Sequence, residues 1–486
     1  MRAGDPLLAA WEETLTRKKN APAIFATTCQ VLRTFRGIEE RASDFESKID
    51  IFEPGSVIAI QIGNHEDWPS ILIACLRKNI VVLPLEQSIK EQQRDAALEI
   101  CCASGIVSGS ASIMPAVRRI LRRSSSRSAG CPTRRAGSVR SPSNVEPPDW
   151  GDKPPSLLKL TSGTTAAPRA IRFRSEQLLA DCAQICETMG VRNVDLNFGI
   201  IPVSHSYGFS NLLTPLIARG VPMVLSRDRL PRAMLADLAR TNATVFPGMP
   251  VLYQALCDIE NVPLLPQLRL CISAGAPLSV AVARKFQEKF KRPIHSFYGA
   301  SECGGICYDE EAANEIEGFV GKPTKDVTLE IVDPDAPASQ VRVRSAAVGD
   351  GYFPEPDTKK FGDGYFVPDD LLASHESGFK IVGRISDVIN VAGEKVNPAE
   401  VEAHLLRFAG IRQAVVFGRE SGLRNEEVMA CVVADVDVGE MNLLDFCRTG
   451  LSSWQVPKRI FIVDAIPVSE RGKINRRSLA HYFASS

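Results

Sequence analysis

Apolar residues recur along this chain in short blocks that alternate with stretches of helical period. Residues 56–62 and 80–85 are almost continuously apolar, which is typical of strands buried on both faces of a sheet. The apolar stretch between them, 68–76, is long enough for a helix. A strand, a helix and a second strand in this order predict a βαβ unit with parallel strands.

The same alternation continues from residue 157 to residue 298, and the pattern then changes twice. Between 320 and 380 only short apolar blocks remain, separated by Gly, Asp and Pro, which predicts a small all-β region. From 398 to 463 helical and strand-like stretches alternate again. The predicted strands are 157–160, 198–203, 221–225, 243–246, 268–273, 294–298, 327–332, 341–344, 364–367, 413–418, 428–435 and 459–463, and the predicted helices are 175–189, 209–218, 231–240, 280–290, 398–408 and 442–449.

These elements predict an α/β fold with a large N-terminal domain, 1–383, and a small α+β C-terminal domain, 384–486. Within the larger domain we expect two doubly wound α/β subdomains, 1–150 and 151–315, and a small β subdomain, 316–383.

An irregular tract at 108–148 interrupts the first subdomain. No acidic residue lies between Glu99 and Glu146, and eight arginines fall between Arg118 and Arg140 among Ser, Gly and Pro. Three explanations fit this composition: a solvated disordered loop, a basic segment that contacts nucleic acid or anionic lipid, or a segment read in a shifted frame that replaces an ordinary strand and helix.

Composition excludes several other classes of protein. The 57 basic and 57 acidic residues cancel, so the overall charge gives no reason to expect nucleic acid as a partner. The 13 cysteines lack the paired Cys or His spacing of a zinc site, which predicts buried free thiols in a reducing compartment. Because there is no signal-peptide pattern and no run of 18 apolar residues, we expect a cytoplasmic protein without integral membrane association.

Candidate chemistry begins where the strand 157–160 runs into Thr161-Ser162-Gly163-Thr164-Thr165 and then Arg169. Such a loop presents N–H groups and hydroxyls to one point, which suits a polyphosphate, although an ordinary Ser/Thr-rich turn has the same composition. SHSYG (204–208), SAGAP (273–277) and YGASE (298–302) also follow predicted strands of the second sheet. Ligands of such sheets bind at the carboxyl ends of the strands, so this shared placement favours a binding site.

Four stretches together resemble the adenylate-forming superfamily, which includes acyl-CoA synthetases, the adenylation domains of nonribosomal peptide synthetases and firefly luciferase. They are LTSGTTAAPRA (160–170), FYGASE (297–302), GYFVPDDL (364–371) with VGRISDVINVAGEKVNPAEVE (382–402), and IPVSERGKINRRSL (466–479). Their order and spacing match nearly the whole chain apart from the arginine-rich tract.

This resemblance implies a two-step ligation that uses ATP and Mg²⁺. A carboxylate attacks the α-phosphate to give acyl-AMP and pyrophosphate, and the thiol of CoA, or of a carrier protein's phosphopantetheine, then displaces AMP. The implied catalytic residues are Lys473, Glu302 and His205, with Glu302 as the metal ligand. The implied ATP/AMP-binding residues are Thr161, Ser162, Gly163, Thr164, Thr165, Arg169, Ala274, Gly275, Ala276, Tyr298, Gly299, Ser301, Asp370 and Arg384. The resemblance also makes the C-terminal domain mobile about a hinge at Ser386, with Gly393, Glu394 and Lys395 on the thiol side.

The chain departs from the family pattern at several positions. Ala166 and Arg169 replace the usual Gly and Lys, Ser386 stands where Asp or Lys is usual at the hinge, and Asp369 competes with Asp370 for the ribose contact. Gly304 and Gly305 stand where the wall of the acyl pocket is expected and would leave room for a chain or a ring.

Three functions remain open. The first is an acyl-CoA synthetase for a fatty or aryl acid. The second is a stand-alone ligase that loads the acid onto an acyl carrier protein, and the third is a catalytically impaired adenylate-binding protein. The expected partner is therefore a small carboxylic acid, with a carrier protein as the alternative acceptor, and we expect no nucleic acid and a monomer or homodimer.

Overall fold

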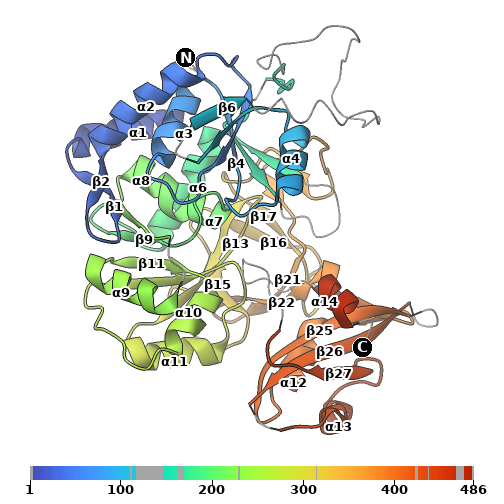
Figure 1. Ribbon diagram of the computed structural model, residues 1–486. Coiled ribbons are helices and arrows are strands. Elements are labelled where there is room, and N and C mark those ends of the chain that lie inside the picture. The colour runs from blue at the N-terminus through green and yellow to red at the C-terminus, as the bar shows by residue number, and fades with distance from the viewer. Residues whose placement is uncertain are drawn as a thin grey trace. The chain divides into compact units, whose positions relative to one another are not determined.

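The computed structural model describes residues 4–109, 112–115, 146–152, 154–161, 169–227, 230–312, 315–421, 425–435, 437–466 and 476–483. The chain divides into two compact units (Figure 1). The first comprises 1–317, 321–329 and 343–366, and the second comprises 318–320, 330–342 and 367–486. Both units mix helices and strands, which confirms the predicted α/β class, whereas the predicted domain limits at 150, 315 and 383 stay predictions.

One sheet of the first unit has seven strands in the order β18-β8-β7-β4-β3-β5-β6. Its centre is parallel, because β3 pairs with β4 and β5 in that sense and β4 with β7. The outer pairs β7–β8, β8–β18 and β5–β6 are antiparallel. The strands are β3 (Val57–Gln61), β4 (Val81–Pro84), β5 (Ala103–Ser108), β6 (Ser112–Pro115), β7 (Leu157–Leu160), β8 (Ala170–Phe173) and β18 (Tyr352–Phe353).

A second sheet of this unit follows the order β2-β1-β10-β9-β11-β12-β13-β14. From β1 to β13 all neighbours are parallel, so the carboxyl ends of β9, β11, β12 and β13 share one edge. The strands are β1 (Pro22–Ala26), β2 (Val31–Thr34), β9 (Asn197–Gly199), β10 (Met223–Leu225), β11 (Val245–Gly248), β12 (Leu270–Ser273), β13 (Ile294–Ala300) and β14 (Gly304–Tyr308), with β15 (Phe319–Pro323) pairing next to β14.

The strand pairing corrects one sequence-based assignment. The strand β1 falls within the first predicted subdomain, 1–150, and β7 within the second, 151–315, yet β1 pairs with β10 of the second sheet and β7 pairs with β4 of the first. An apolar block indicates that a strand is buried. The alternation of its side chains between the two faces of a sheet does not indicate which strand lies beside it. The strand β7, which precedes TSGTT in the sequence, therefore lies in a different sheet from β12 and β13, where SAGAP and YGASE begin.

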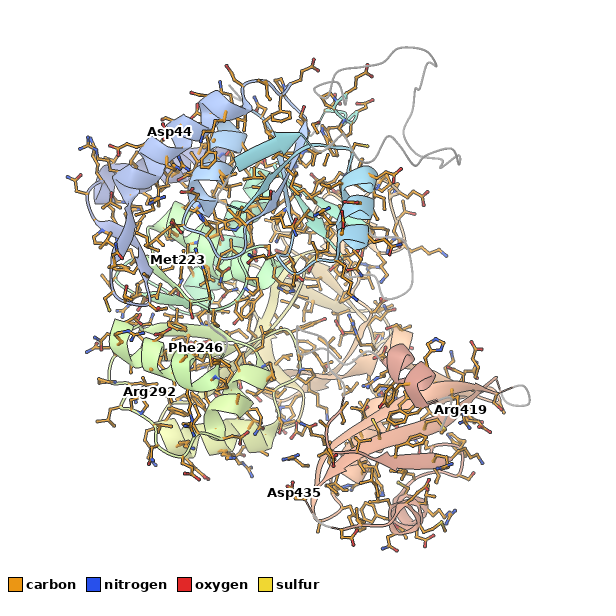
Figure 2. All side chains as sticks on the ribbon, in the orientation of Figure 1. Asp44, Met223, Phe246, Arg292, Arg419 and Asp435 are labelled. Atoms are coloured by element: carbon orange, nitrogen blue, oxygen red, sulfur yellow. The ribbon has the colours of Figure 1, made fainter. Side chains whose placement is uncertain are left out.

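Strand β3 shows why its sequence is continuously apolar. Ile58 and Ile60 belong to the large core, whereas Val57 and Ala59 belong to a smaller cluster on the opposite face. Successive side chains of a strand point to opposite faces, so a strand covered on both sides needs apolar residues at every position. Side chains fill the interior of this unit; Met223 and Phe246 are fully buried, and Asp44 lies at the surface (Figure 2).

Helices of the first unit begin at residues suited to that position. Asp5 accepts hydrogen bonds from the N–H groups of Leu7 and Leu8 at 3.0 Å and so caps the first helix, and Thr34 caps the second through the N–H of Gly37. The helices are α1 (Pro6–Lys18), α2 (Phe35–Ile49), α3 (Trp68–Arg77), α4 (Glu91–Ile100), α6 (Ser175–Thr188), α7 (Ser206–Gly208), α8 (Thr214–Arg219), α9 (Pro231–Thr241), α10 (Pro250–Cys257) and α11 (Val280–Phe290).

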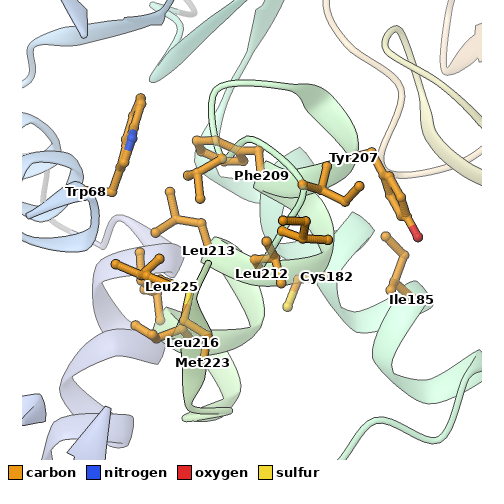
Figure 3. Packing of buried hydrophobic residues seen from close by; sticks show 14 of the residues in the cluster. Trp68, Cys182, Ile185, Tyr207, Phe209, Leu212, Leu213, Leu216, Met223 and Leu225 are labelled. Carbon is orange, nitrogen blue, oxygen red and sulfur yellow. The ribbon is translucent and has the colours of Figure 1, made fainter. Parts of the chain in front are cut away.

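The helix predicted over 209–218 begins with a π-helical turn. Residues Phe209–Leu213 form this turn and α8 continues it, so that Phe209, Leu212 and Leu213 pack into the core (Figure 3). π-Helical turns are rare in proteins, and those that interrupt a helix often lie near functional sites.

Short strands confirm the change of pattern between 320 and 380. Strands β17 and β19 both pair antiparallel with β20. These strands are β16 (Thr328–Ile331), β17 (Val341–Arg344), β19 (Phe361–Gly362) and β20 (Tyr365–Phe366).

The described residues of the second unit form three antiparallel hairpins, β21–β22, β23–β24 and β25–β26, and have their own apolar core. The long hairpin of β25 and β26 carries Arg419 and ends near Asp435 (Figure 2), and α12 and α13 pack on it through residues such as Val401 and Leu443. Its elements are β21 (Asp370–His375), β22 (Gly378–Arg384), β23 (Ile389–Val391), β24 (Glu394–Val396), α12 (Pro398–Leu405), β25 (Ile411–Ser421), β26 (Asn425–Ala434), α13 (Glu440–Gly450), β27 (Arg459–Ile462) and α14 (Arg476–Tyr482).

The tract 108–148 was predicted to be irregular, but β6 lies inside it and pairs antiparallel with β5 at the edge of the sheet. The eight arginines from Arg118 to Arg140 lie outside the described residues.

The prediction of buried thiols is confirmed, because ten of the twelve described cysteines are buried and all twelve are free. None of the helices in the described ranges has the length and apolar content that crossing a lipid bilayer requires.

Candidate active site

The predicted phosphate loop connects the two strands of a hairpin. Leu160 pairs with Ala170 across β7 and β8, and both the N–H and the hydroxyl of Thr161 donate to the carbonyl of Arg169, at 2.8 and 3.1 Å. Thr161 and Arg169 therefore lie side by side where the loop begins and ends. The predicted residues Ser162, Gly163, Thr164 and Thr165, and the departure Ala166, lie outside the described residues.

Arg169 stacks on an aromatic ring. Its guanidinium carbon lies 4.0 Å from the ring centroid of Tyr352, and its Nη1 lies 3.6 Å from Oδ2 of Asp357. A planar guanidinium stacks on a ring more favourably than an ammonium does, so arginine in place of the usual lysine suits this contact.

Glu302 follows β13 and contacts the same tyrosine. The hydroxyl of Tyr352 donates to Oε1 of Glu302 at 2.9 Å, and the N–H of Gly349 donates to the Glu302 carbonyl at 2.9 Å. Burial, together with the Glu302 carboxylate, raises the pKa of Tyr352 far above its usual range, so this hydroxyl remains a donor at every physiological pH.

The metal chemistry of this region rests on one carboxylate. Across the described ranges no group of three or more His, Cys, Asp or Glu residues could hold a metal ion. Mg²⁺ in nucleotide sites is bound through one or two carboxylates, with substrate phosphates and water as its other ligands. The donor chemistry of Glu302 therefore fits Mg²⁺ that arrives with ATP, and it does not fit an all-protein metal site.

Ser206, which follows His205 in SHSYG, contacts Ser301 of YGASE. The hydroxyl of Ser206 donates to Oγ of Ser301 at 2.9 Å. Nδ1 of His205 accepts from the N–H of Tyr207 at 3.2 Å and so caps α7. When Nδ1 is the acceptor, a neutral imidazole carries its proton on Nε2.

The SAGAP and YGASE segments lie at the shared edge of the second sheet. β12 ends at Ser273, and Ala274 and the left-handed Gly275 (φ +88°) follow, with Gly275 in open space. Tyr298 is 7% exposed, and a side chain at Gly299 would lie 2.6 Å from the carbonyl of Gly304 across β13 and β14. Ala276 comes next to Gly275 and is partly exposed.

The glycines expected to leave room for the acyl group pack against side chains. A Cβ at Gly304, where φ is +72°, would overlap Oδ1 of buried Asp181, which also accepts from the N–H of Gly305 at 3.0 Å. A Cβ at Gly305 would lie 3.0 Å from the ring of Phe297. Both glycines are therefore explained by close packing.

Lys159, on β7, is a cation in an otherwise apolar strand. It is 5% exposed, and its Nζ lies 4.5 Å from the ring centroid of Phe173. Burial lowers the pKa of Lys159, although Asp181 and, more weakly, other nearby groups act in the opposite direction. Within the described part of the chain its ammonium makes neither a hydrogen bond nor an ion pair.

The remaining predicted site residues belong to the second unit. Nε of Arg384 donates to Oδ1 of Asp370 at 2.8 Å, so the two predicted ribose contacts lie together, whereas Asp369 uses its carbonyl to accept from the N–H of Ile385. The hydroxyl of the predicted hinge residue Ser386 donates to Asp387 at 3.2 Å.

Gly393 lies in the exposed turn between β23 and β24, where its φ is +98°, and Glu394 and Lys395 are the first two residues of β24 and are exposed. Lys473 lies outside the described residues, three positions before the start of α14. Arg476, the first residue of α14, is paired with Asp387 at 3.2 Å and with Glu402 at 3.0 Å.

Two contacts in this region were not predicted from the sequence. Tyr352 lies in GYFPEPD (351–357), outside the four motif stretches. Lys159 could have been noticed as a charge in the buried strand LLKL. The contacts of the Tyr352 ring and of the Lys159 ammonium are with residues distant in sequence, so the sequence alone does not show them.

Comparison with known proteins agrees with this geometry. The chain is 30% identical over 347 residues to a probable CoA ligase from Humulus lupulus, an alignment that covers 68% of this chain and 66% of the relative. It is 27% identical over 327 residues to a 3,4-dihydroxybenzoate–[aryl-carrier protein] ligase from Bacillus anthracis, covering 67% of this chain and 73% of that protein. The chain thus spans about two thirds of the length of these relatives.

Among solved structures, ATP-bound MatB from Rhodopseudomonas palustris has the same fold, with a TM-score of 0.82, 19% identity and coverage of 98% of each chain. Residues 11–353 match the family described as AMP-binding enzyme, and residues 400–473 match the AMP-binding enzyme C-terminal domain. Since the first match alone covers well over half of the sequence, the chain belongs to the AMP-binding enzyme family.

Proposed function

We propose that this chain is an AMP-forming acid–thiol ligase, which activates a fatty or aryl acid as acyl-AMP and transfers the acyl group to CoA. The observation that carries the proposal is that three separate motif segments meet in the first unit. Arg169 at the end of the phosphate loop reaches Glu302 through Tyr352, and Ser206, beside His205, bonds to Ser301. A loop suited to phosphates, a hard oxygen ligand and a histidine are the groups that adenylation requires.

In the first half-reaction a carboxylate oxygen of the acid attacks the α-phosphorus of ATP. The new P–O bond forms as the bond to the β-phosphate oxygen breaks, and pyrophosphate leaves. Thr161 and the loop residues Ser162, Gly163, Thr164 and Thr165 would bind the departing phosphates, and Ser301 would bind the α-phosphate. Catalysis of this kind consists of positioning and of neutralising charge as it develops.

Lys473 would place its ammonium between the attacking carboxylate and the α-phosphate oxygens. Arg169 would add charge near the phosphates, held in a fixed orientation by its ring contact with Tyr352. Mg²⁺, when bound by Glu302 and the ATP phosphates, would neutralise phosphate charge. His205 would flank the acid's carboxylate, with its ring oriented by the hydrogen bond that Nδ1 accepts from Tyr207.

Two sets of residues would bind the nucleoside. Ala274, Gly275 and Ala276 would let their backbone approach the adenine, on which Tyr298 would stack next to Gly299. Asp370 would accept hydrogen bonds from the ribose hydroxyls, and its ion pair with Arg384 supports a fixed carboxylate orientation.

In the second half-reaction the thiol sulfur attacks the acyl carbon, the bond to the AMP oxygen breaks and AMP leaves. The C-terminal domain would turn about Ser386 between the two steps and bring Gly393, Glu394 and Lys395 to the thiol side. CoA is the proposed acceptor. The likeness to an aryl-carrier protein ligase supports a carrier-protein phosphopantetheine as the alternative.

The function is tested by exchange of labelled pyrophosphate into ATP with a panel of carboxylic acids. We expect exchange that depends on Mg²⁺ and on one class of acid, followed by AMP release with CoA. Exchange without AMP release when CoA is added, but with AMP release when a phosphopantetheinylated carrier is added, would identify the alternative acceptor. No exchange with any acid, despite binding of ATP, would replace the proposal with an adenylate-binding protein.

Lys473→Ala separates the two half-reactions. The ammonium is needed as charge develops during adenylation, so we expect a loss of pyrophosphate exchange of about a hundredfold or more. Thioester formation from supplied acyl-AMP should be retained. Lys359→Ala, at an exposed lysine of the first unit, is the matched control and should change neither rate. Equal loss of both half-reactions in Lys473→Ala would contradict the proposed role.

A further inference from the structure

Three residues form a continuous chain of contacts from the phosphate loop to the proposed metal ligand. Arg169 stacks on the ring of Tyr352 at 4.0 Å, and the hydroxyl of the same tyrosine donates to Oε1 of Glu302 at 2.9 Å. One aromatic side chain thus contacts both groups expected to surround the triphosphate, through its face on one side and its hydroxyl on the other.

Tyr352 is held in place independently of Arg169 and Glu302. Its backbone pairs with Ile171 in β8, two residues after Arg169 at the end of the phosphate loop. The side chain is 4% exposed, and its ring meets Phe361 edge to face at 5.0 Å. A ring fixed by its strand and by a perpendicular neighbour gives its hydroxyl a fixed position, and so restricts the carboxylate that accepts from it.

We propose that Tyr352 is a positioning residue, which orients the Glu302 carboxylate for the Mg²⁺ that enters with ATP. This inference rests on the proposed function. Tyr352 acts through Glu302, because its hydroxyl is used on the carboxylate, while its ring supports Arg169 beside the loop. A metal-binding carboxylate that is already oriented does not lose rotational freedom when the metal complex binds. Partners that orient metal ligands in this way commonly contribute a factor of about ten or more to metal affinity.

The test measures ATP binding by titration calorimetry at a series of Mg²⁺ concentrations in wild type and in Tyr352→Phe. Phenylalanine keeps the ring beneath Arg169 and removes only the hydroxyl. We expect the Mg²⁺ concentration for half-maximal ATP binding to rise about tenfold, with the weaker ATP binding in excess EDTA unchanged. High Mg²⁺ should restore pyrophosphate exchange, because the metal ligand itself is intact.

A matched control and a double mutant make the result specific. Tyr365 also carries a guanidinium over its ring, that of Arg344 at 5.2 Å, so Tyr365→Phe removes a hydroxyl from a comparable stack and should leave the Mg²⁺ dependence unchanged. In a Glu302→Ala background, Tyr352→Phe should have no further effect on the Mg²⁺ dependence. Thermal unfolding shows whether each variant is folded.

The inference is overturned if Tyr352→Phe keeps the wild-type Mg²⁺ dependence. It is also overturned if ATP binding in EDTA falls by the same factor as binding with Mg²⁺, or if the effect persists without Glu302. Each of these outcomes leaves the proposed ligase function intact as long as the wild type binds MgATP and exchanges pyrophosphate. A wild type that binds no MgATP overturns both.

Discussion

Replacing Lys159 with methionine is expected to stabilise the first unit. The ammonium lies in a buried strand and is surrounded by the rings of Phe173 and Phe209. Its pKa is lowered by burial even though Asp181 attracts it, so the whole environment disfavours the charged form. Methionine fills a similar volume without the charge.

The magnitude follows from opposing contributions. Replacing a poorly compensated buried charge with an apolar side chain of similar volume stabilises proteins by up to about 4 kcal/mol. The lost contact with the Phe173 ring costs about 1–2 kcal/mol, and the methionine sulfur regains about 0.3–1.5 kcal/mol against the same ring. The net gain is about 1–2 kcal/mol, which raises the melting temperature of a unit of this size by about 1–4 °C.

The effect should also depend on pH with a defined sign. Because the pKa of Lys159 is lower in the folded state than its ordinary value of 10.5, the unfolded chain binds more protons between these two pKa values. Wild-type stability therefore rises with pH in that window relative to Lys159→Met. The advantage of the variant should be largest below the window and shrink as pH approaches 10.5.

Differential scanning calorimetry at several pH values provides the measurement. Lys322→Met, on the exposed side of β15, is the matched control and should change the free energy of unfolding by less than about 0.5 kcal/mol. A lower melting temperature for Lys159→Met would show that attraction by Asp181 and Glu302 outweighs desolvation. That result would refute the reasoning.

Two further substitutions test contacts in each unit. Arg476→Met leaves the partly buried Glu402 without its cation and should destabilise the second unit by about 1–3 kcal/mol in thermal unfolding. Burial already raises the pKa of Glu402, so the carboxyl is more protonated at pH 5 than at pH 8. The loss of stability caused by Arg476→Met should therefore be larger at pH 8 than at pH 5, and an equal loss at both pH values would contradict this reasoning. Gly304→Ala places a Cβ against Asp181 at positive φ and should cost about 1–3 kcal/mol in calorimetry, whereas Gly439→Ala, which has open space, should be nearly neutral.

Much of the fold could be predicted because burial leaves a record in sequence. The continuous apolar run of β3 and the alternation that follows Leu157 gave the α/β class and most strand positions. The strand ends at SAGAP and YGASE were predicted for the same reason, and parallel pairing brings them to one edge.

Pairing partners and cross-chain contacts could not be predicted in the same way. Nothing in the sequence of β1 or β7 distinguishes one parallel neighbour from another, because both neighbours demand the same apolar residues. The hydrogen bond between Tyr352 and Glu302 depends on the pairing of β18 with β8, two segments that are far apart in the chain. Gly304 and Gly305 were interpreted as open space, whereas Asp181 and Phe297 fill it.

The burial of the thiols makes alkylation a gauge of unfolding. Burial raises the pKa of Cys75, Cys101 and Cys271 to about 12, so the thiolate that reacts with an alkylating reagent is almost absent in the folded protein. Cys29 is the exposed thiol among the described cysteines. Its reaction with a maleimide probe should be fast, while the buried thiols should react only at the rate at which the surrounding core opens.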